Sequence, residues 1–73
     1  MREVVITGAG GFIGSELTRK YVDEGYRVIA VSLSFNSTFP DSNQIIKVQM
    51  DLDDPKKILE IIPKSEYEAF FFI

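Results

Sequence analysis

Four of the five glycines in this 73-residue chain lie between residues 8 and 14, in the segment VVITGAGGFIG that spans residues 4–14. They directly follow β-branched, apolar residues, a pattern typical of a strand that is buried on both faces. Glycines at the end of such a strand allow backbone N–H groups to approach an anion without side chains in the way. The chemistry that this spacing indicates is the binding of a phosphate or pyrophosphate group.

The exact spacing of the glycines separates three phosphate-binding patterns. The dinucleotide pattern G-x-G-x-x-G would need a third glycine at position 13, which is occupied by Ile13. The variant T-G-x-x-G-x-x-G fits in full, and its members are Thr7, Gly8, Gly11 and Gly14. A P-loop needs Lys followed by Ser or Thr after its last glycine, and no Lys stands there in this segment. We therefore expect dinucleotide binding and no phosphoryl transfer.

Each glycine of the fitting pattern has a physical role in such a site. Gly8 would let the chain leave the strand by a tight turn, and Gly11 would let a pyrophosphate approach the backbone. Gly14 lies one helical turn further on, where a missing side chain would let helix and sheet pack closely. The alternative is a glycine-rich turn without a ligand. The buried strand before the glycines and the helix after them favour nucleotide binding.

The periodicity after the glycines predicts a helix over residues 12–24. Ile13, Leu17 and Tyr21 recur every four residues, and Gly25 stands where a helix C-terminal cap is expected. Short apolar runs then predict strands, whereas residues 32–44 are polar and read as a loop with room for one turn of helix. The expected strands are residues 4–6, 28–31, 45–50 and 69–73.

A second helix is expected between the last two strands. Asp54 is a suitable N-cap, Pro55 fits the first helical position, and Pro63 ends the apolar pattern. The order strand-helix-strand-loop-strand-helix-strand implies an α/β domain with a parallel sheet and right-handed crossovers. In a Rossmann arrangement the four strands would have the order 3-2-1-4.

Composition excludes several other classes of protein. Eleven acidic and eight basic residues give a net charge of −3, without the basic stripe that nucleic-acid binding requires. There is no Cys or His for disulfides or a structural zinc site, so we expect no metal. Glu3 interrupts the short apolar start, which argues against a signal peptide, and no apolar run is long enough to span a membrane. We expect a cytoplasmic protein, and we interpret the glycosylation pattern at residues 36–38 as chance.

Three segments together resemble a known family. VITGAGGFIG at residues 5–14, GYRVIAVS at 25–32 and VQMDL at 48–52 are similar to the N-terminus of the extended short-chain dehydrogenases, the NAD-dependent epimerase/dehydratase family that includes the UDP-glucose 4-epimerases. The resemblance covers essentially the whole chain. It implies NAD or NADP as the cofactor and epimerisation, dehydration or reduction of a nucleotide-sugar as the reaction.

The resemblance also implies roles for individual residues. Asp51 and Leu52 match an Asp–aliphatic pair whose carboxylate accepts a hydrogen bond from the adenine amino group and whose next backbone N–H contacts the ring. Asp51 could instead be a solvated residue of the acidic stretch that it shares with Asp53 and Asp54. The residues implied to line the cofactor pyrophosphate are Gly8, Gly11, Phe12, Ile13 and Gly14.

The residue after the second strand departs from the family pattern. NAD-preferring members have an acidic residue there that holds the ribose 2′-OH, whereas this chain has Ser32. No carboxylate therefore repels the 2′-phosphate of NADP, yet no Arg or Lys between Ser32 and Gln44 could pair with it. The choice between NAD and NADP stays open, with a lean to NADP or dual use, and Ser32 could also be an ordinary loop residue.

The catalytic pair that the family uses, Tyr-x-x-x-Lys, does not occur in this sequence. The residues four places after the three tyrosines are Gly25, Ala30 and Phe71. We therefore expect residues 1–73 to be the N-terminal half of an NAD(P)-binding domain, a fragment that is inactive alone and lacks the substrate-binding part. Two alternatives stay open: a non-catalytic NAD(P)-binding regulator, and a small ligand-free α/β module that self-associates through its apolar last strand.

Overall fold

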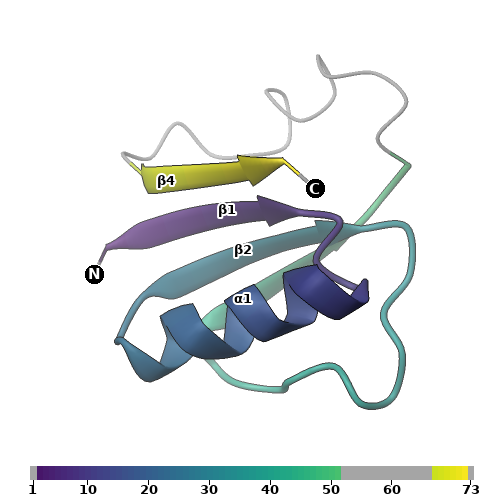
Figure 1. Cartoon of the computed structure of the whole chain (residues 1–73), viewed down its shortest axis with the longest axis horizontal. Coiled ribbons are helices and arrows are strands. Elements are labelled where there is room, and N and C mark those ends of the chain that lie inside the picture. The colour runs from purple at the N-terminus through teal and green to yellow at the C-terminus, as the bar shows by residue number, and fades with distance from the viewer. Residues whose placement is uncertain (1, 52–66, 73) are drawn as a thin grey trace.

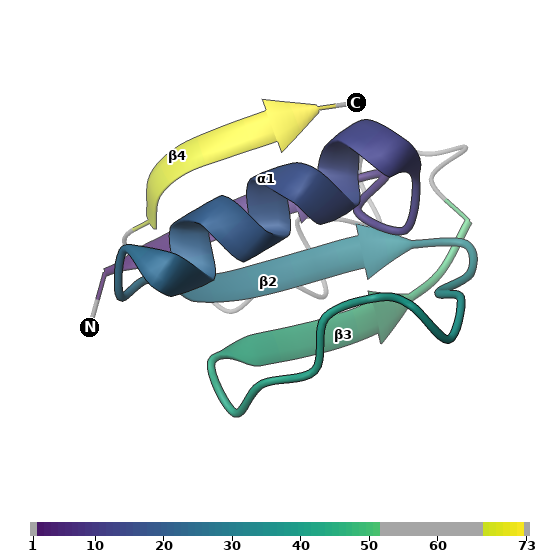
Figure 2. The ribbon, with the colours of Figure 1, turned by 60° about the horizontal axis from the view of Figure 1, so that its bottom comes forward.

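The strands of this chain form one parallel sheet. The structure, a computed structural model, describes residues 2–51 and the backbone of residues 67–72. The sheet has the order β3-β2-β1-β4, and its neighbouring strands run parallel (Figure 1 for β4, β1 and β2; Figure 2 for β2 and β3). The predicted α/β class with a parallel sheet is confirmed. The elements are β1 (Glu3–Thr7), α1 (Phe12–Asp23), β2 (Arg27–Ser32), β3 (Ile45–Gln49) and β4 (Tyr67–Phe72).

The element bounds differ by one or two residues from those expected. The strands β1 and β2 each begin one residue earlier and end one residue later than the apolar runs, because polar residues also join the hydrogen-bonded ladder. The strand β4 covers Tyr67–Phe72 rather than 69–73. The second helix, expected after Asp54, lies outside the described residues.

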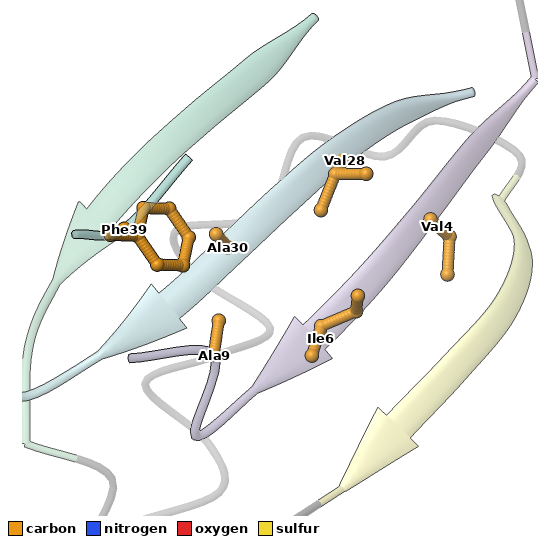
Figure 3. Close-up of a cluster of buried hydrophobic side chains, with 6 residues drawn as sticks. All are labelled: Val4, Ile6, Ala9, Val28, Ala30 and Phe39. Atoms are coloured by element: carbon orange, nitrogen blue, oxygen red, sulfur yellow. The ribbon is translucent and has the colours of Figure 1, made fainter. Parts of the chain in front are cut away.

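The core is built on both faces of β1 and β2, as the uninterrupted β-branched runs predict. All five residues of β1 are buried, as are the last five of β2. Val5, Ile29 and Val31 form a cluster on one face of the sheet. A second cluster forms with α1 on the other face, and its members are Val4, Ile6, Ala9, Val28, Ala30 and Phe39 (Figure 3). Each fully buried Val or Ile contributes about 1.5–3 kcal/mol to stability.

The helix α1 lies across one face of the sheet (Figure 2) and packs against the core through Leu17 and Tyr21. Its C-terminus has the hydrogen bonds of a Schellman motif: Gly25 N–H donates to Val22 O at 3.0 Å and Tyr26 N–H donates to Tyr21 O at 2.9 Å. Gly25 has φ +87°, a conformation that favours glycine. The predicted C-terminal cap at Gly25 is confirmed.

Residues 33–44 connect β2 to β3 without a helix and pack against the core through Phe39. That ring is 6% exposed and contacts Phe35 edge-to-face at a centroid distance of 4.7 Å. The Gln44 side chain fixes the end of the segment, because its Nε2 donates to Tyr26 O at 2.8 Å. Phe39 thus anchors this segment in the core cluster on the face of the sheet that α1 covers.

Candidate functional site

The glycine loop, residues 8–11, leaves β1 at the carboxyl edge of the sheet, where parallel α/β sheets bind ligands. Gly8 has φ +66°, which confirms the tight turn expected there. The loop is closed by Gly11 N–H, which donates to Gly8 O at 3.1 Å. It is also held against β2, because Ala9 N–H donates to Val31 O at 3.1 Å.

The helix α1 begins at the end of this loop without a side-chain cap. Gly11 is the N-cap residue, with an extended backbone (φ −79°, ψ 178°), and no side chain bonds to the first turn. The first backbone bond of the helix is donated by Ser15 N–H to Gly11 O at 2.9 Å. The amides of Phe12 and Ile13 therefore precede that bond and lie at the positive end of the helix dipole. An anion placed here could accept hydrogen bonds from these amides, because no side chain accepts from them as a cap.

The fold requires a missing side chain at two of the glycines, Gly10 and Gly14. A Cβ on Gly10 would overlap Ser34 O and lie 2.7 Å from Ser32 Oγ. A Cβ on Gly14 would overlap Gly8 O and lie 2.6 Å from Ala9 Cα. The interpretation of Gly14 is corrected in one respect: its close contact is with the backbone of the glycine loop rather than with a strand.

Gly11 is different, because the chain itself leaves room for a side chain there. A Cβ at this position would meet only Gly8 O, at 3.5 Å, which is an ordinary contact. Its φ of −79° is open to any residue. Packing within the protein thus does not explain a glycine at Gly11, whereas a ligand that approaches the backbone at the start of α1 does. The residues at this turn fit a dinucleotide pyrophosphate.

Two of the residues expected at the adenosine end, Ser32 and Asp51, lie at the same edge of the sheet. Ser32 is the last residue of β2; it is buried, and its Oγ donates to Ser34 O at 2.9 Å. Asp51 is exposed and comes two residues after the end of β3. Because β1, β2 and β3 are parallel, their carboxyl ends share one edge, where Ser32 ends β2 and Asp51 follows β3. Leu52 lies outside the described residues.

A hollow of about 310 Å³ opens beside the glycine loop, between α1 and the segment after β2. Arg19 bridges these two elements: its Nη2 donates to Thr38 O at 2.9 Å and its Nη1 forms an ion pair with Glu16 Oε1 at 2.8 Å. We call this space the Arg19 hollow. Its lining residues are Gly10, Gly11, Phe12, Ser15, Glu16, Arg19, Asn36 and Thr38.

Sequence reasoning missed two features of this region. Gly10 lies outside the fitted glycine pattern, although its partial match to G-x-G-x-x-G was a usable signal. Arg19 lies in the middle of a helix, and its approach to Thr38 spans 19 positions. The spacing of the sequence does not show that Arg19 lies near the segment after β2.

Two negative findings concern the described part of the chain. Among the side chains that the structure describes, no group of three or more His, Cys, Asp or Glu is placed to hold a metal ion. Within residues 2–51 and 67–72, no helix has the length and apolar character needed to cross a membrane.

Comparison with known proteins gives relatives in two bacteria. The chain is 32% identical over 63 residues to a 2-alkyl-3-oxoalkanoate reductase of Stenotrophomonas maltophilia (strain K279a), an alignment that covers 82% of this chain and 18% of the relative. Among solved structures, it is similar to a short-chain dehydrogenase with bound NAD+ from Leptospira borgpetersenii serovar Hardjo-bovis (strain JB197), with 38% identity and a TM-score of 0.71. That match covers 82% of this chain and 24% of the dehydrogenase.

The chain thus spans about a fifth to a quarter of the length of these relatives. A family model, described as the NAD dependent epimerase/dehydratase family, matches residues 4–72. The match includes the glycine loop, the uncapped start of α1 and the four described strands apart from Glu3. This chain therefore belongs to the NAD-dependent epimerase/dehydratase family, whose cofactor is NAD or NADP.

Proposed function

We propose that the glycine loop and the start of α1 hold the pyrophosphate of NAD(P). The observation that carries this proposal is Gly11: it leaves an open approach beside the amides of Phe12 and Ile13 and is not needed for packing. Hydrogen bonds from those amides and the helix dipole would stabilise the diphosphate charge. Gly8 and Gly14 would act indirectly, since they shape the turn and seat the helix on it.

The adenosine half of the cofactor would extend from this turn along the carboxyl edge of the sheet. Ser32 would lie near the ribose, because its Oγ is adjacent to Gly10 of the glycine loop. Asp51 would accept a hydrogen bond from the adenine amino group, and the backbone N–H of Leu52 would contact the ring. These assignments extend the family resemblance to the residues that follow β2 and β3.

For the whole protein we propose an oxidoreductase of the epimerase/dehydratase type that acts on nucleotide-sugars. Residues 1–73 would form the N-terminal half of its Rossmann domain, with sheet order 3-2-1-4, and would be inactive without the catalytic and substrate-binding parts. When bound, NAD(P) would accept or deliver a hydride. A second candidate is a reductase of an oxo acid, which the name of the Stenotrophomonas relative favours. Assays of the full-length protein with both substrate classes would separate the two.

Two non-enzymatic functions make different predictions for this chain. A regulator would bind the cofactor but show no turnover in its full-length form. A ligand-free module would instead self-associate through β4, which is at an edge of the described sheet. Size-exclusion chromatography with and without dinucleotide distinguishes the module, because it would be oligomeric and indifferent to NAD(P).

The proposed pyrophosphate site is tested by calorimetric titration of the chain with NAD+ and NADP+. We expect saturable binding by the wild type and none by Gly11→Val, because the added side chain blocks the approach of the diphosphate. Gly25→Ala is the matched control, since it changes a glycine at the opposite end of α1. It should lower stability and leave affinity unchanged. Equal affinity of Gly11→Val and wild type would refute the assignment.

A further inference from the structure

The Arg19 hollow contains a cation that lies beside the glycine loop. Arg19 is half-exposed, and its two observed hydrogen bonds occupy two of the five N–H donors of its guanidinium group. Arg19 lines this hollow together with Gly10 and Gly11. A guanidinium group in this position could bind a phosphate at the adenosine side of the proposed pyrophosphate site.

No other described basic residue lines this hollow. Lys20 lines a separate surface hollow formed with Phe12, Ile13, Glu16 and Leu17. The rest have other partners: Arg2 lies over the Tyr26 ring, Arg27 pairs with Glu3, and Lys47 lies over the Phe39 ring. Arg19 is thus the one described cation that faces the glycine loop across a hollow.

A neutral donor accompanies Arg19 in the same hollow. Asn36 Oδ1 accepts hydrogen bonds from Thr38 N–H at 3.1 Å and from Thr38 Oγ1 at 2.7 Å. Asn36 also lines the hollow, and its side-chain amide has two N–H donors that a ligand bound there could use. Ser32, at the neighbouring end of β2, has no charge that would repel an anion.

We propose that Arg19, supported by Asn36, binds the 2′-phosphate of NADP and makes this chain prefer NADP to NAD. This inference rests on the proposed function, because it needs the pyrophosphate at the glycine loop. Gly10 connects the two regions: it lines the Arg19 hollow, and a Cβ at this position would lie 2.7 Å from Ser32 Oγ, beside the proposed ribose position. The Glu16 carboxylate also lines the hollow and opposes an anion; its ion pair uses one Nη1 donor of Arg19 and leaves other donors of the guanidinium group for a phosphate.

The test compares the dissociation constants of NADP+ and NAD+ for wild type, Arg19→Gln and Arg19→Lys by calorimetry. The wild type should bind NADP+ more tightly by about tenfold, the effect of one charge-assisted contact. Arg19→Gln should remove this preference and leave the NAD+ constant within about twofold, since a single neutral contact is worth little in solvent. Arg19→Lys should keep part of the preference because it keeps the charge.

Lys20→Gln is the matched control, since it removes the same charge from the next residue of α1 and should leave the preference unchanged. If Arg19→Gln weakens both cofactors equally, Arg19 only holds the segment at Thr38 and the inference is wrong. It is also wrong if the wild type binds NAD+ as tightly as NADP+, in which case the proposed pyrophosphate site stands. If the wild type binds neither cofactor, both proposals fail. Circular dichroism of each variant checks that it is folded.

Discussion

The neighbouring glycines of this turn have different physical requirements. Gly10 and Gly14 have backbone atoms of other residues where a Cβ would be, whereas Gly11 has open space. The first two therefore serve the fold, and the third is available to a ligand. The spacing of the glycines in the sequence predicts the turn, but it does not show which glycine serves which purpose. That distinction depends on Ser34 and Ala9, which approach only in the folded chain.

This difference predicts different effects of alanine at the three positions. Gly10→Ala and Gly14→Ala should each destabilise the chain by about 1–3 kcal/mol, because overpacking forces the backbone to shift. Gly11→Ala should cost less, about 0.5–1 kcal/mol, because nothing crowds its Cβ and the loss is limited to the weaker preference of Ala for the N-cap position. Urea denaturation followed by circular dichroism measures all three. Equal losses at the three positions would contradict the account of Gly11.

Ser32 provides a second prediction for a single residue. Ser32→Asp should shift the affinity ratio toward NAD, because a carboxylate beside the ribose accepts from its 2′-OH and repels a 2′-phosphate. Ser32→Asn is the control, since it has the same shape without the charge. The measurement is the ratio of NAD+ to NADP+ dissociation constants. A ratio that Ser32→Asp leaves unchanged would mean that the end of β2 lies away from the ribose.

At the scale of elements, the pattern of apolar residues was sufficient to predict α1 and the described strands to within two residues. The β-branched runs of β1 and β2 predict burial on both faces, and their residues have that burial. The segment between β2 and β3 was harder to interpret, because it is mostly polar and yet contains one residue of the core. Phe39 belongs to the core, yet nothing in the spacing of residues 32–44 distinguishes it from Phe35.

The role of Phe39 can be tested through stability. Phe39→Ala should cost about 3–5 kcal/mol, since it leaves a cavity between the segment and the sheet. Phe39→Leu should cost less because it fills most of that space, and it keeps the test informative if the alanine variant does not fold. Thermal and urea unfolding provide the measurement. A cost for Phe39→Ala below about 1 kcal/mol would mean that the segment is not anchored by this ring.

At the scale of the whole molecule, 73 residues bury a small core, and stability is marginal at this size. The sequence contains no cysteine that could add a disulfide. A ligand that binds only the folded chain would therefore raise the free energy of unfolding by a large fraction of its value. The sequence predicted the α/β class and the family, because a buried strand, a glycine turn and an amphipathic helix occur in the required order.

Cofactor should therefore raise the melting temperature in a concentration-dependent way. At a free concentration of 100 times the dissociation constant, the gain in stability is about 2.7 kcal/mol for a single site. Differential scanning fluorimetry with NAD+, NADP+ and adenosine measures it, and adenosine should have a much smaller effect because it lacks the pyrophosphate. A melting temperature that does not respond to either dinucleotide would contradict the proposal that the folded chain binds them.

The central claim is that the backbone amides at the start of α1 hold the diphosphate of the cofactor. The most direct measurement is a titration of the 15N-labelled chain with NAD+ and NADP+, followed by two-dimensional NMR. We predict that the largest amide shifts are at Gly11, Phe12 and Ile13, with smaller shifts at Ser32 and Asp51. Saturable binding that leaves the amides of Phe12 and Ile13 unshifted would contradict the account.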